Sequence, residues 1–434
     1  ATDEERNRWT DFVMRFQQLT GPLMAKGSED TALYVYNRLL SLNEVGGAPD
    51  RFGASVEEFH DFNLRRLARW PHAMNATATH DTKRGEDARA RINVLSELPA
   101  EWEKNLRTWS RTNRAKKTKL RGAEAPDRND EYFLYQTLIG SYPLHQDQDG
   151  QFLERLTSYL IKAVREAKVH TEWLKPDGAY EQAFVDFARQ ILAPAASNRF
   201  MEEFLPFAKR IAYCGMFNSL SQTLLKIASP GVPDIYQGTE LWDLSFVDPD
   251  NRRPVDYAER RHLLEELKGA EVKDRPGLLR DLMSRWEDGR IKLYLIHKLL
   301  DFRRAHQELF TDGEYLPLEA TGESRQAVCA FARRKGQTWA LAVVPCLVGN
   351  TVYHGTPPLG AGVWNSTALS LRDDMPGRWL DIISGERLEA SDTAPTKNLL
   401  LRGVFNNFPV ALLYHEDALA ESQLIGESLH AAIV

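Results

Sequence analysis

The run ATATHDTKRGED, from Ala76 to Asp87, decides the fold, because it joins a short β-prone stretch to a polar loop and then to a charged helix start. The adjacent pair His80-Asp81 lies where the strand would end. A second run, SPGVPDIYQGTEL from Ser229 to Leu241, has the form of a buried strand that emerges into a polar, glycine-containing loop. Barrel folds place functional groups at such strand exits. The two runs therefore predict neighbouring strands of one α/β barrel.

Composition limits the classes of protein to consider. A chain of 434 residues is long enough for two or three domains, and its net charge of −6 mixes both signs, so nothing global favours nucleic acid or an anionic membrane. Cys214, Cys329 and Cys346 are isolated in apolar surroundings, which predicts reduced core residues in a cytoplasmic protein. The first residues lack a signal-peptide pattern, and no apolar stretch reaches the ~18 residues that a membrane span needs.

Helical spacing dominates the first part of the chain. Trp9, Phe12 and Phe16 predict an amphipathic helix at the start, followed by a break at Gly21-Pro22 and a loop-then-helix segment. A second helix is expected from about Val56 to Trp70, ending before Pro71, with a short strand up to Thr79. From residue 87 to about 219 the pattern is helical throughout, which predicts an all-helical insertion between two barrel strands.

Alternating apolar runs bounded by turns dominate the last part. The clearest, AVCAFARRKGQTWALAVV from Ala327 to Val344, predicts two strands around a turn at residues 334–337. Later runs near Trp364, at 379–383 and at 410–414 predict a small β-sandwich. We therefore expect four segments: 1–86, a barrel segment with an active-site loop and the penultimate strand; 87–219, the helical insertion; 220–303, the last barrel strand and helices; and 304–434, the β-sandwich domain.

Three long runs carry a family resemblance: the His-Asp run, RFQQLTGPLMAKGSEDTALYVYNRLLSLNEVGG (Arg15 to Gly47) and VPDIYQGTELWDLSFVDPDNRRPVDY (Val232 to Tyr257). They resemble the α-amylase family of glycoside hydrolases and, within it, the intramolecular transglucosylases that form trehalose ends on maltooligosaccharides. The resemblance covers most of the first 300 residues and, more weakly, the remainder. It implies an α/β fold class: the last part of a (β/α)8 TIM barrel with a large all-helical insertion, followed by a C-terminal β-sandwich domain.

The same resemblance implies an activity. Such an isomerase converts the reducing-end α-1,4 link of a maltooligosaccharide into an α,α-1,1 link by a retaining mechanism, as part of trehalose biosynthesis. In that family the nucleophile and the acid/base carboxylate lie upstream of the His-Asp run. We therefore expect this chain to be the C-terminal portion of such an enzyme, inactive alone, with maltooligosaccharide as substrate and with the N-terminal barrel portion, as a separate chain, among its expected partners. No cofactor, metal, nucleic acid or membrane partner is expected.

Asp81 is the catalytic residue that the resemblance implies, as a helper and not as nucleophile or acid. A carboxylate at this place accepts hydrogen bonds from sugar hydroxyls as the ring flattens, and such bonds strengthen in the transition state. His80 would donate to a hydroxyl of the same ring, whereas the alternative is a helix N-cap formed by His80-Asp81 with Thr82. Lys83 and Arg84 would position neighbouring hydroxyls or the catalytic carboxylates, or are ordinary basic residues at a helix start.

The pocket for the leaving reducing-end glucose is expected in the segment from Lys26 to Arg38. The resemblance implies that Lys26 and Glu29 line this subsite, and tyrosines supply a flat face for a sugar ring together with a polar tip. The alternative is a buried Lys-Glu ion pair with core tyrosines. The further substrate-binding residues expected are Tyr34, Tyr36 and Arg38 near that subsite, and Tyr236, beside Gln237 and Glu240, at the exit of the last strand.

Several other readings stay open. The chain is alternatively another α-1,4-glucan hydrolase or transferase of the amylase family, or a non-catalytic carbohydrate-binding polypeptide. The loop DPDNRR, 248–253, either reaches the site or is a salt-bridged turn. The basic run from Arg107 to Arg121 predicts a solvated helical face, and the histidines lack the HxxxH or HxH spacing of a zinc site.

Overall fold

The computed structural model describes residues 2–143, 149–194, 198–352, 355–393 and 396–415. The chain combines α-helices with β-sheets and divides into two compact units. Unit 1 holds residues 1–52, 80–209 and 244–253, and unit 2 holds 53–79, 210–243 and 254–434. The four segments expected from the sequence stay a prediction, and 416–434 of the last one lie outside the described residues.

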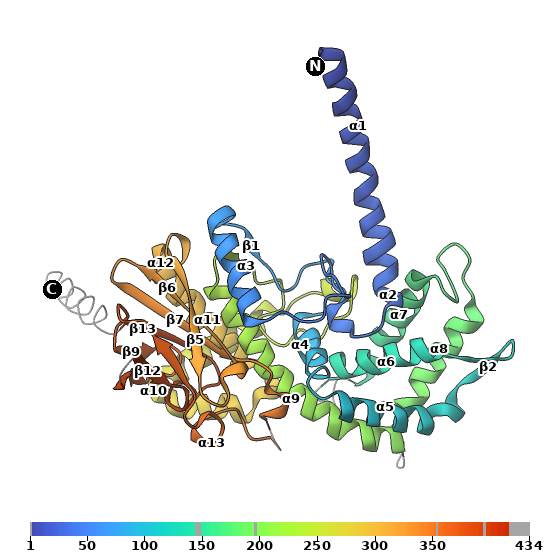
Figure 1. Ribbon diagram of the computed structural model, residues 1–434. Helices are drawn as coiled ribbons and strands as arrows, with labels where there is room; N and C mark the ends of the chain where they lie inside the picture. The colour runs from blue at the N-terminus through green and yellow to red at the C-terminus, as the bar shows by residue number, and fades with distance from the viewer. Residues whose placement is uncertain (1, 144–148, 195–197, 353–354, 394–395, 416–434) are drawn as a thin grey trace. The chain divides into compact units, whose positions relative to one another are not determined.

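Unit 1 opens with a long helix that buries none of its side chains. α1 (Asp3–Pro22) begins with a capping box in which Thr2 and Glu5 exchange hydrogen bonds, and it continues directly into the π-helix η1 (Leu23–Ala32) and α2 (Leu33–Val35). The predicted break at Gly21-Pro22 is therefore wrong. Pro22 lacks an N–H donor, but it lies inside α1 and the π-helical turns of η1 follow it directly. In Figure 1, α1 extends away from the other helices of its unit.

The rest of unit 1 is mainly helical. It contains the helices α4 (Glu86–Val94), α5 (Pro99–Asn113), α6 (Arg128–Ser141), α7 (Asp149–Ala167), α8 (Gly178–Ile191) and the first part of α9 (Arg199–Ala228). The expectation of an all-helical stretch is wrong at one place, where β2 (Thr118–Leu120) pairs antiparallel with β3 (Ala123–Ala125). Arg121 and Gly122 between them both have positive φ, the conformation of a two-residue hairpin turn.

An aromatic cluster forms the centre of this helical part. Trp109 of α5 is fully buried, and its ring contacts those of Tyr135, Phe200, Phe204 and Phe207 at centroid distances of 5.5 to 5.9 Å. Aromatic rings bury large areas and prefer such edge-on arrangements. The cluster fixes α5, α6 and the first turns of α9 against one another.

Unit 2 contains the two short strands that the His-Asp run and the second run predict. β1 (Met74–Asn75) pairs in parallel with β4 (Val232–Pro233), so that Asn75 lies opposite Pro233. α3 (Val56–Arg69) precedes β1 and ends at the C-cap Trp70, as predicted. Gly231 has a φ of +120°, and a Cβ there would lie 2.5 Å from the carbonyl oxygen of Ala73. A glycine is required where β4 approaches β1 so closely.

Two arginines, the buried Arg333 and the half-buried Arg303, hold the end of α9 and the start of β4. Arg333 donates to the carbonyl oxygens of Ala228, Phe310 and Gly313, and Arg303 donates to those of Ile227 and Gly231. The last carbonyls of a helix have no partner within the helix, so these guanidinium groups satisfy them. Burial lowers the pKa of each guanidinium to about 10.

Further helices and a large sheet belong to unit 2. Before the sheet come α10 (Tyr257–Ser284), which kinks at Asp274, α11 (Arg290–Ala305) and α12 (Gln307–Thr311), and the short α14 (Leu401–Val404) follows β12. The nine-stranded antiparallel sheet has the order β10-β9-β13-β7-β6-β5-β8-β12-β11. Its strands are β5 (Glu314–Thr321), β6 (Val328–Lys335), β7 (Thr338–Pro345), β8 (Ala368–Leu371), β9 (Arg378–Asp381), β10 (Arg387–Glu389), β11 (Ser391–Thr393), β12 (Thr396–Leu400) and β13 (Ala411–His415).

The predicted hairpin is confirmed, because β6 pairs with β7 in register from Val328↔Pro345 to Lys335↔Thr338. β5 links the two parts of the sheet: residues 314–318 pair with β6, and 319–321 pair with β8. Leu341, Leu413 and Leu399, from both parts, belong to one core cluster. The run near Trp364 is instead a short helix, α13 (Ala361–Trp364), with β8 beginning four residues later. Among the described residues no helix is long and apolar enough to span a membrane.

Candidate active site

The His80-Asp81 pair lies in the loop between β1 and α4, at the first residues of unit 1 after β1. Both side chains are exposed. The carbonyl oxygen of His80 accepts a hydrogen bond of 3.1 Å from Nδ2 of the buried Asn251, which holds the loop at this point. α4 begins at Glu86 with Gly85 as N-cap and without a side-chain cap. The alternative that His80-Asp81 caps the helix is therefore wrong, and the pair faces solvent.

Lys83, two residues after the pair, is buried and is held at both its backbone and its side chain. Its side chain is 2% exposed, and its Nζ lies 2.9 Å from Oδ1 of Asp30 and 6.0 Å from the centre of the Tyr34 ring. Its backbone N–H donates to Oε1 of Glu44 over 2.8 Å, while Oε2 of Glu44 pairs with Arg89. The reading of Lys83 as an ordinary exposed basic residue is therefore wrong.

Arg84 points into the interior of unit 1. Its guanidinium donates to the carbonyl oxygen of Leu40 and to the hydroxyl of Tyr159, and it lies 5.7 Å from the centre of the Phe133 ring. Tyr159 in turn stacks on Phe246 at 4.6 Å. The described contacts of Arg84 are thus with the packed core, which makes it a support of the loop that carries Asp81. A direct contact of Arg84 with substrate stays a prediction.

Lys26 pairs with a residue that the sequence analysis did not select. Its Nζ lies 2.5 Å from Oδ2 of Asp30, one helical turn on, whereas Oε1 of Glu29 accepts the backbone N–H of Gly46. The alternative of a buried Lys-Glu ion pair is therefore wrong, since Lys26 is exposed and its partner is Asp30. Burial alone would raise the pKa of Asp30, but hydrogen bonds from Lys26 and Lys83 outweigh it and hold that pKa below its ordinary value.

The other residues expected around this subsite have different environments. Tyr34 is buried, and burial raises the pKa of its hydroxyl, whereas Tyr36 is 41% exposed. Arg38 is exposed with its guanidinium 5.2 Å from the centre of the Phe52 ring, and its carbonyl oxygen accepts from the hydroxyl of Tyr132. The structure thus brings Lys26, Lys83 and Tyr34 together around Asp30, and it places Tyr36 and Arg38 on the exposed continuation of the segment.

Tyr236 belongs to unit 2, where it follows β4. It is half-buried, and its carbonyl oxygen accepts from the N–H and the hydroxyl of Thr239, which closes a turn. Glu240 pairs with Arg260 at 3.0 Å. β1 and β4 are parallel neighbours, so the chain leaves both strands at the same edge of the pair. Tyr236 therefore extends from the edge at which the loop to His80 starts.

The DPDNRR loop, in unit 1, is a salt-bridged turn. Asp250 accepts two hydrogen bonds of 2.7 Å from the guanidinium of Arg155, and it also pairs with Arg253. Asp248 pairs with Arg252, while its carbonyl oxygen accepts from Lys162. These bonds tie the loop to α7 and to itself, and Asn251 of the same loop donates to the carbonyl oxygen of His80, so the loop also reaches the candidate site.

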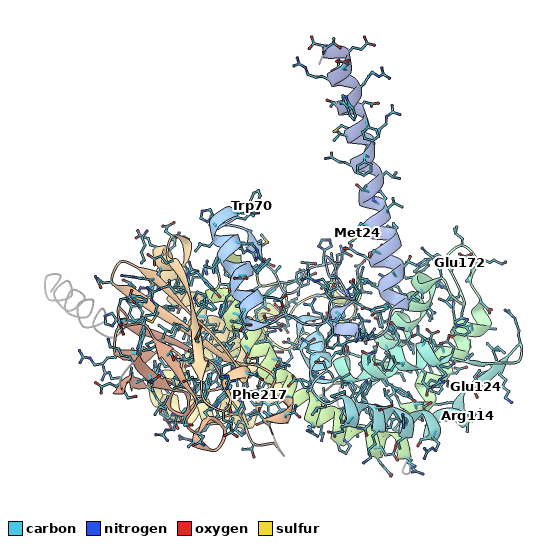
Figure 2. The ribbon with its side chains drawn as sticks, in the orientation of Figure 1. Met24, Trp70, Arg114, Glu124, Glu172 and Phe217 are labelled. Carbon is cyan, nitrogen blue, oxygen red and sulfur yellow. The ribbon has the colours of Figure 1, made fainter. Side chains whose placement is uncertain are left out.

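The basic run of unit 1 is largely neutralised by acidic neighbours. Arg114 donates to Glu124 over 3.1 Å (Figure 2), Lys117 pairs with the buried Glu131 at 2.7 Å, and Arg121 pairs with Asp177. The predicted solvated helical face is correct for Arg107 and Arg114, which form exposed pairs, but it is wrong further on, because Lys117 forms a buried ion pair and Lys119 lies in β2.

A different cluster joins Asp127, Asp130 and His170, whose possible ligand atoms lie within 4.8 Å of one another. The side chains of this cluster already form hydrogen bonds within the protein. Asp127 caps α6 and contacts His170, and Asp130 accepts from the Tyr180 hydroxyl. Burial raises the pKa of Asp130 to about 6. Internal bonding accounts for this geometry without an ion.

Sequence reasoning missed Asp30 and Glu44. The spacing of Lys26 and Asp30 by four residues on a helix was an available signal, because such residues are neighbours on a helix surface. Glu44 gave no local signal, since its partners Lys83 and Arg89 lie 39 and 45 residues further on.

Comparison with known proteins gives relatives over almost the whole chain, although no family model matches it. A curated protein of Mycobacterium tuberculosis (strain CDC 1551 / Oshkosh), named maltooligosyl trehalose synthase, is 37% identical over 407 residues, which are 94% of this chain and 46% of that protein. The corresponding protein of strain ATCC 25618 / H37Rv gives the same values.

Solved structures agree. The maltooligosyltrehalose synthase of Arthrobacter ramosus is 34% identical with a TM-score of 0.75, over 92% of this chain and 46% of that one. A hypothetical maltooligosyl trehalose synthase of Sulfolobus tokodaii is 31% identical with a TM-score of 0.69 and covers 95% and 48%. The chain spans about half the length of the curated relatives it matches. Over nearly all of its own length, this chain is similar to maltooligosyl trehalose synthases, as the resemblance of its three long runs implied.

Proposed function

We propose that this chain supplies the C-terminal portion of an intramolecular transglucosylase that converts the reducing-end α-1,4 link of maltooligosaccharides into an α,α-1,1 link. The observation that carries the proposal is the 37% identity to the named synthase over 94% of the chain. The nucleophile and the acid/base carboxylate then belong to polypeptide outside this chain. The fold proposed with this function is the last part of a (β/α)8 barrel with a helical insertion. The cytoplasmic location of the protein stays a prediction.

The parallel pair of β1 and β4 supports a barrel remainder. Parallel strands need a long crossover connection, and here the connection carries the helices α4 to α9. Functional groups of barrel enzymes lie where strands end. The loop with His80 and Asp81 starts at the end of β1, so these two residues are proposed to contact substrate.

Asp81 is proposed to act through hydrogen bonds. Its exposed carboxylate accepts from hydroxyl groups of the reacting ring, and these bonds strengthen as positive charge develops at the anomeric carbon. His80 contributes a donor to the same ring. Lys26, Glu29 and Lys83 line the place of the released glucose, which must stay bound, turn and attack through its own anomeric hydroxyl while water is excluded.

The partner that completes the barrel is proposed to cover α1. Apolar side chains of α1 are exposed over wide areas: Trp9 (67%), Phe12 (58%), Phe16 (56%) and Leu19 (59%). Figure 2 shows side chains around α1 pointing away from it, without a neighbouring element. Contiguous exposed apolar surface marks an interaction surface. The relatives are about twice as long as this chain. We therefore propose that a polypeptide equivalent to their other half covers this face of α1.

The test is a product analysis. The chain is incubated with maltopentaose, alone and with the separately produced remaining half of the M. tuberculosis relative, and the products are assigned by NMR of their anomeric protons. An α,α-1,1-linked product that needs both polypeptides is expected, together with loss of at least ~100-fold in rate for Asp81→Asn and no change for Asp61→Asn, on the exposed face of α3. Release of glucose without that product would instead favour a hydrolase, and binding without turnover a carbohydrate-binding polypeptide.

A further inference from the structure

Asp30 occupies a special place among the charged residues of unit 1. Its two carboxylate oxygens are divided between two lysines: Oδ2 accepts from Lys26 at 2.5 Å, and Oδ1 accepts from Lys83 at 2.9 Å. Lys26 and Lys83 are 57 residues apart in the sequence, on η1 and on the loop after β1. A single carboxylate thus joins the two segments in which the substrate-binding lysines are expected.

The two lysines need this carboxylate for different reasons. Lys83 is almost completely buried, and a buried ammonium without a counter-charge is strongly unfavourable. Lys26 is exposed, and its hydrogen bond to Asp30, followed by the Coulomb attraction of that carboxylate, raises its pKa. Further negative charges facing Lys26 come from Glu166 and Asp81. Without Asp30 the exposed lysine would rotate freely and the buried one would lose its partner.

We propose that Asp30 is a positioning residue that holds Lys26 and Lys83 in fixed places against the released glucose. The proposal rests on the proposed transglucosylase function. The exposed ammonium of Lys26 carries three N–H donors, and the bond to Asp30 uses one of them, so donors stay available for sugar hydroxyls. The buried Lys83 ties the loop that carries Asp81 to the same carboxylate. Asp30 itself touches the lysines and not the reacting atoms, so it acts through them.

Fixing the glucose has a chemical consequence. In the second step of the retaining reaction, the anomeric hydroxyl oxygen of the released glucose attacks the anomeric carbon of the glycosyl-enzyme. The bond to the nucleophile carboxylate breaks, and the hydroxyl proton passes to the acid/base carboxylate. Water is the competing acceptor in the same step, and it yields free glucose and a shortened chain. Loosening the lysines therefore favours hydrolysis over rearrangement.

The experiment compares product ratios in the complete enzyme, reconstituted from this chain and the complementary polypeptide, with maltopentaose as substrate. Asp30→Asn is expected to raise the ratio of hydrolysis to α,α-1,1 product at least ~5-fold, and also to raise KM for the transfer. A ~5-fold change in the ratio corresponds to a loss of about 1 kcal/mol in positioning the glucose. Asp30→Glu, which keeps the charge, is expected to restore most of the ratio. Glu103→Gln is the matched control, because Glu103 also pairs with a basic residue four positions away on a helix, Arg107. This substitution is expected to leave the product ratio unchanged.

Because Asp30→Asn leaves the buried Lys83 without its partner, that variant could unfold, so a second variant at the exposed Lys26 tests the same proposal. Lys26→Met removes one partner without burying a charge, and it is expected to raise the same ratio. If Asp30 acts through Lys26, the two substitutions combined change the ratio by less than the product of their separate effects. An unchanged ratio in folded Asp30→Asn, or fully multiplicative effects, overturns the proposal. Absence of α,α-1,1 product from the unsubstituted enzyme would instead refute the proposed function.

Discussion

α1 of unit 1 and the sheet of unit 2 use apolar residues in opposite ways. Leu341 and Leu413, on neighbouring strands β7 and β13, are fully buried, and they lie in a core cluster that both parts of the sheet share. α1 buries none of its residues, although Phe12 and Phe16 stack on each other at 6.2 Å. The sheet is stabilised by its own burial, whereas α1 has a capping box and helical hydrogen bonds but no buried side chain. Three measurements test this contrast.

The largest expected effect comes from removing one apolar side chain in each place. Leu413→Ala should lower the free energy of unfolding of unit 2 by about 3 kcal/mol, through lost burial and a cavity between β7 and β9. Phe16→Ala should change the free energy of unfolding of the chain by less than about 0.5 kcal/mol. Urea denaturation with hydrogen exchange of the strand amides measures both. Equal costs would show that the face of α1 is already covered.

The next comparison concerns two carboxylates, one in each unit. Asp381 of β9 is fully buried and accepts from Ser384 and from the backbone N–H of Ile383 and Ser384; burial raises its pKa to about 6. A folded pKa above the unfolded one, about 3.9, means that acidification from pH 7 to pH 4 stabilises the folded state. The pKa of Asp30 is lowered, so its contribution is lost as the pH falls.

Asp381→Asn should remove this acid stabilisation of unit 2, about 2 kcal/mol between pH 7 and pH 4 relative to the unsubstituted chain. The readout is the slope of unfolding free energy against pH, since the substitution also changes hydrogen bonds at every pH. A slope that stays the same in the variant would assign the pH dependence to other groups.

The smallest effect separates two helices with the same local start. α1 and α3 both begin with a capping box, formed by Thr2 with Glu5 and by Ser55 with Glu58. α3 also packs on the sheet, where His60 contacts the Tyr315 hydroxyl at 2.8 Å. Ser55→Ala should lower the unfolding free energy of unit 2 by about 1 kcal/mol. Thr2→Ala should only speed exchange of the first α1 amides, and a global loss of stability in that variant would break the comparison.

Much of the local structure was predictable from the sequence. The span of α3 follows from its apolar spacing and from Pro71, and the β6-β7 hairpin follows from alternation around Gly336, whose φ is +59°. The predictions failed where local patterns conflict. The helix formers around the β2-β3 hairpin concealed its turn, and Gly21-Pro22 suggested a break where the helix in fact continues into η1.

The candidate site was predictable only in part. The His80-Asp81 loop and Lys26 were selected by resemblance to the family, but Asp30 and Glu44 were not. Charge pairing depends on which segments lie within a few ångströms, and Lys83 meets Asp30 across 53 residues. A sequence pattern shows which residues are able to form ion pairs, and it does not show which of them meet.

The sequence by itself determined the helical and strand segments, the exposed loop after β1 and the family likeness, because capping, apolar periodicity and turn residues act over a few positions. Only the tertiary structure decided that β1 pairs with β4, that Asp30 joins Lys26 to Lys83, and that Arg84 is buried beside Tyr159. The pairings of Asp30 with Lys83, Arg84 with Tyr159 and Met74 with Val232 join residues 53, 75 and 158 positions apart. Their free energy comes from burial and charge pairing, which arise only when the chain has folded.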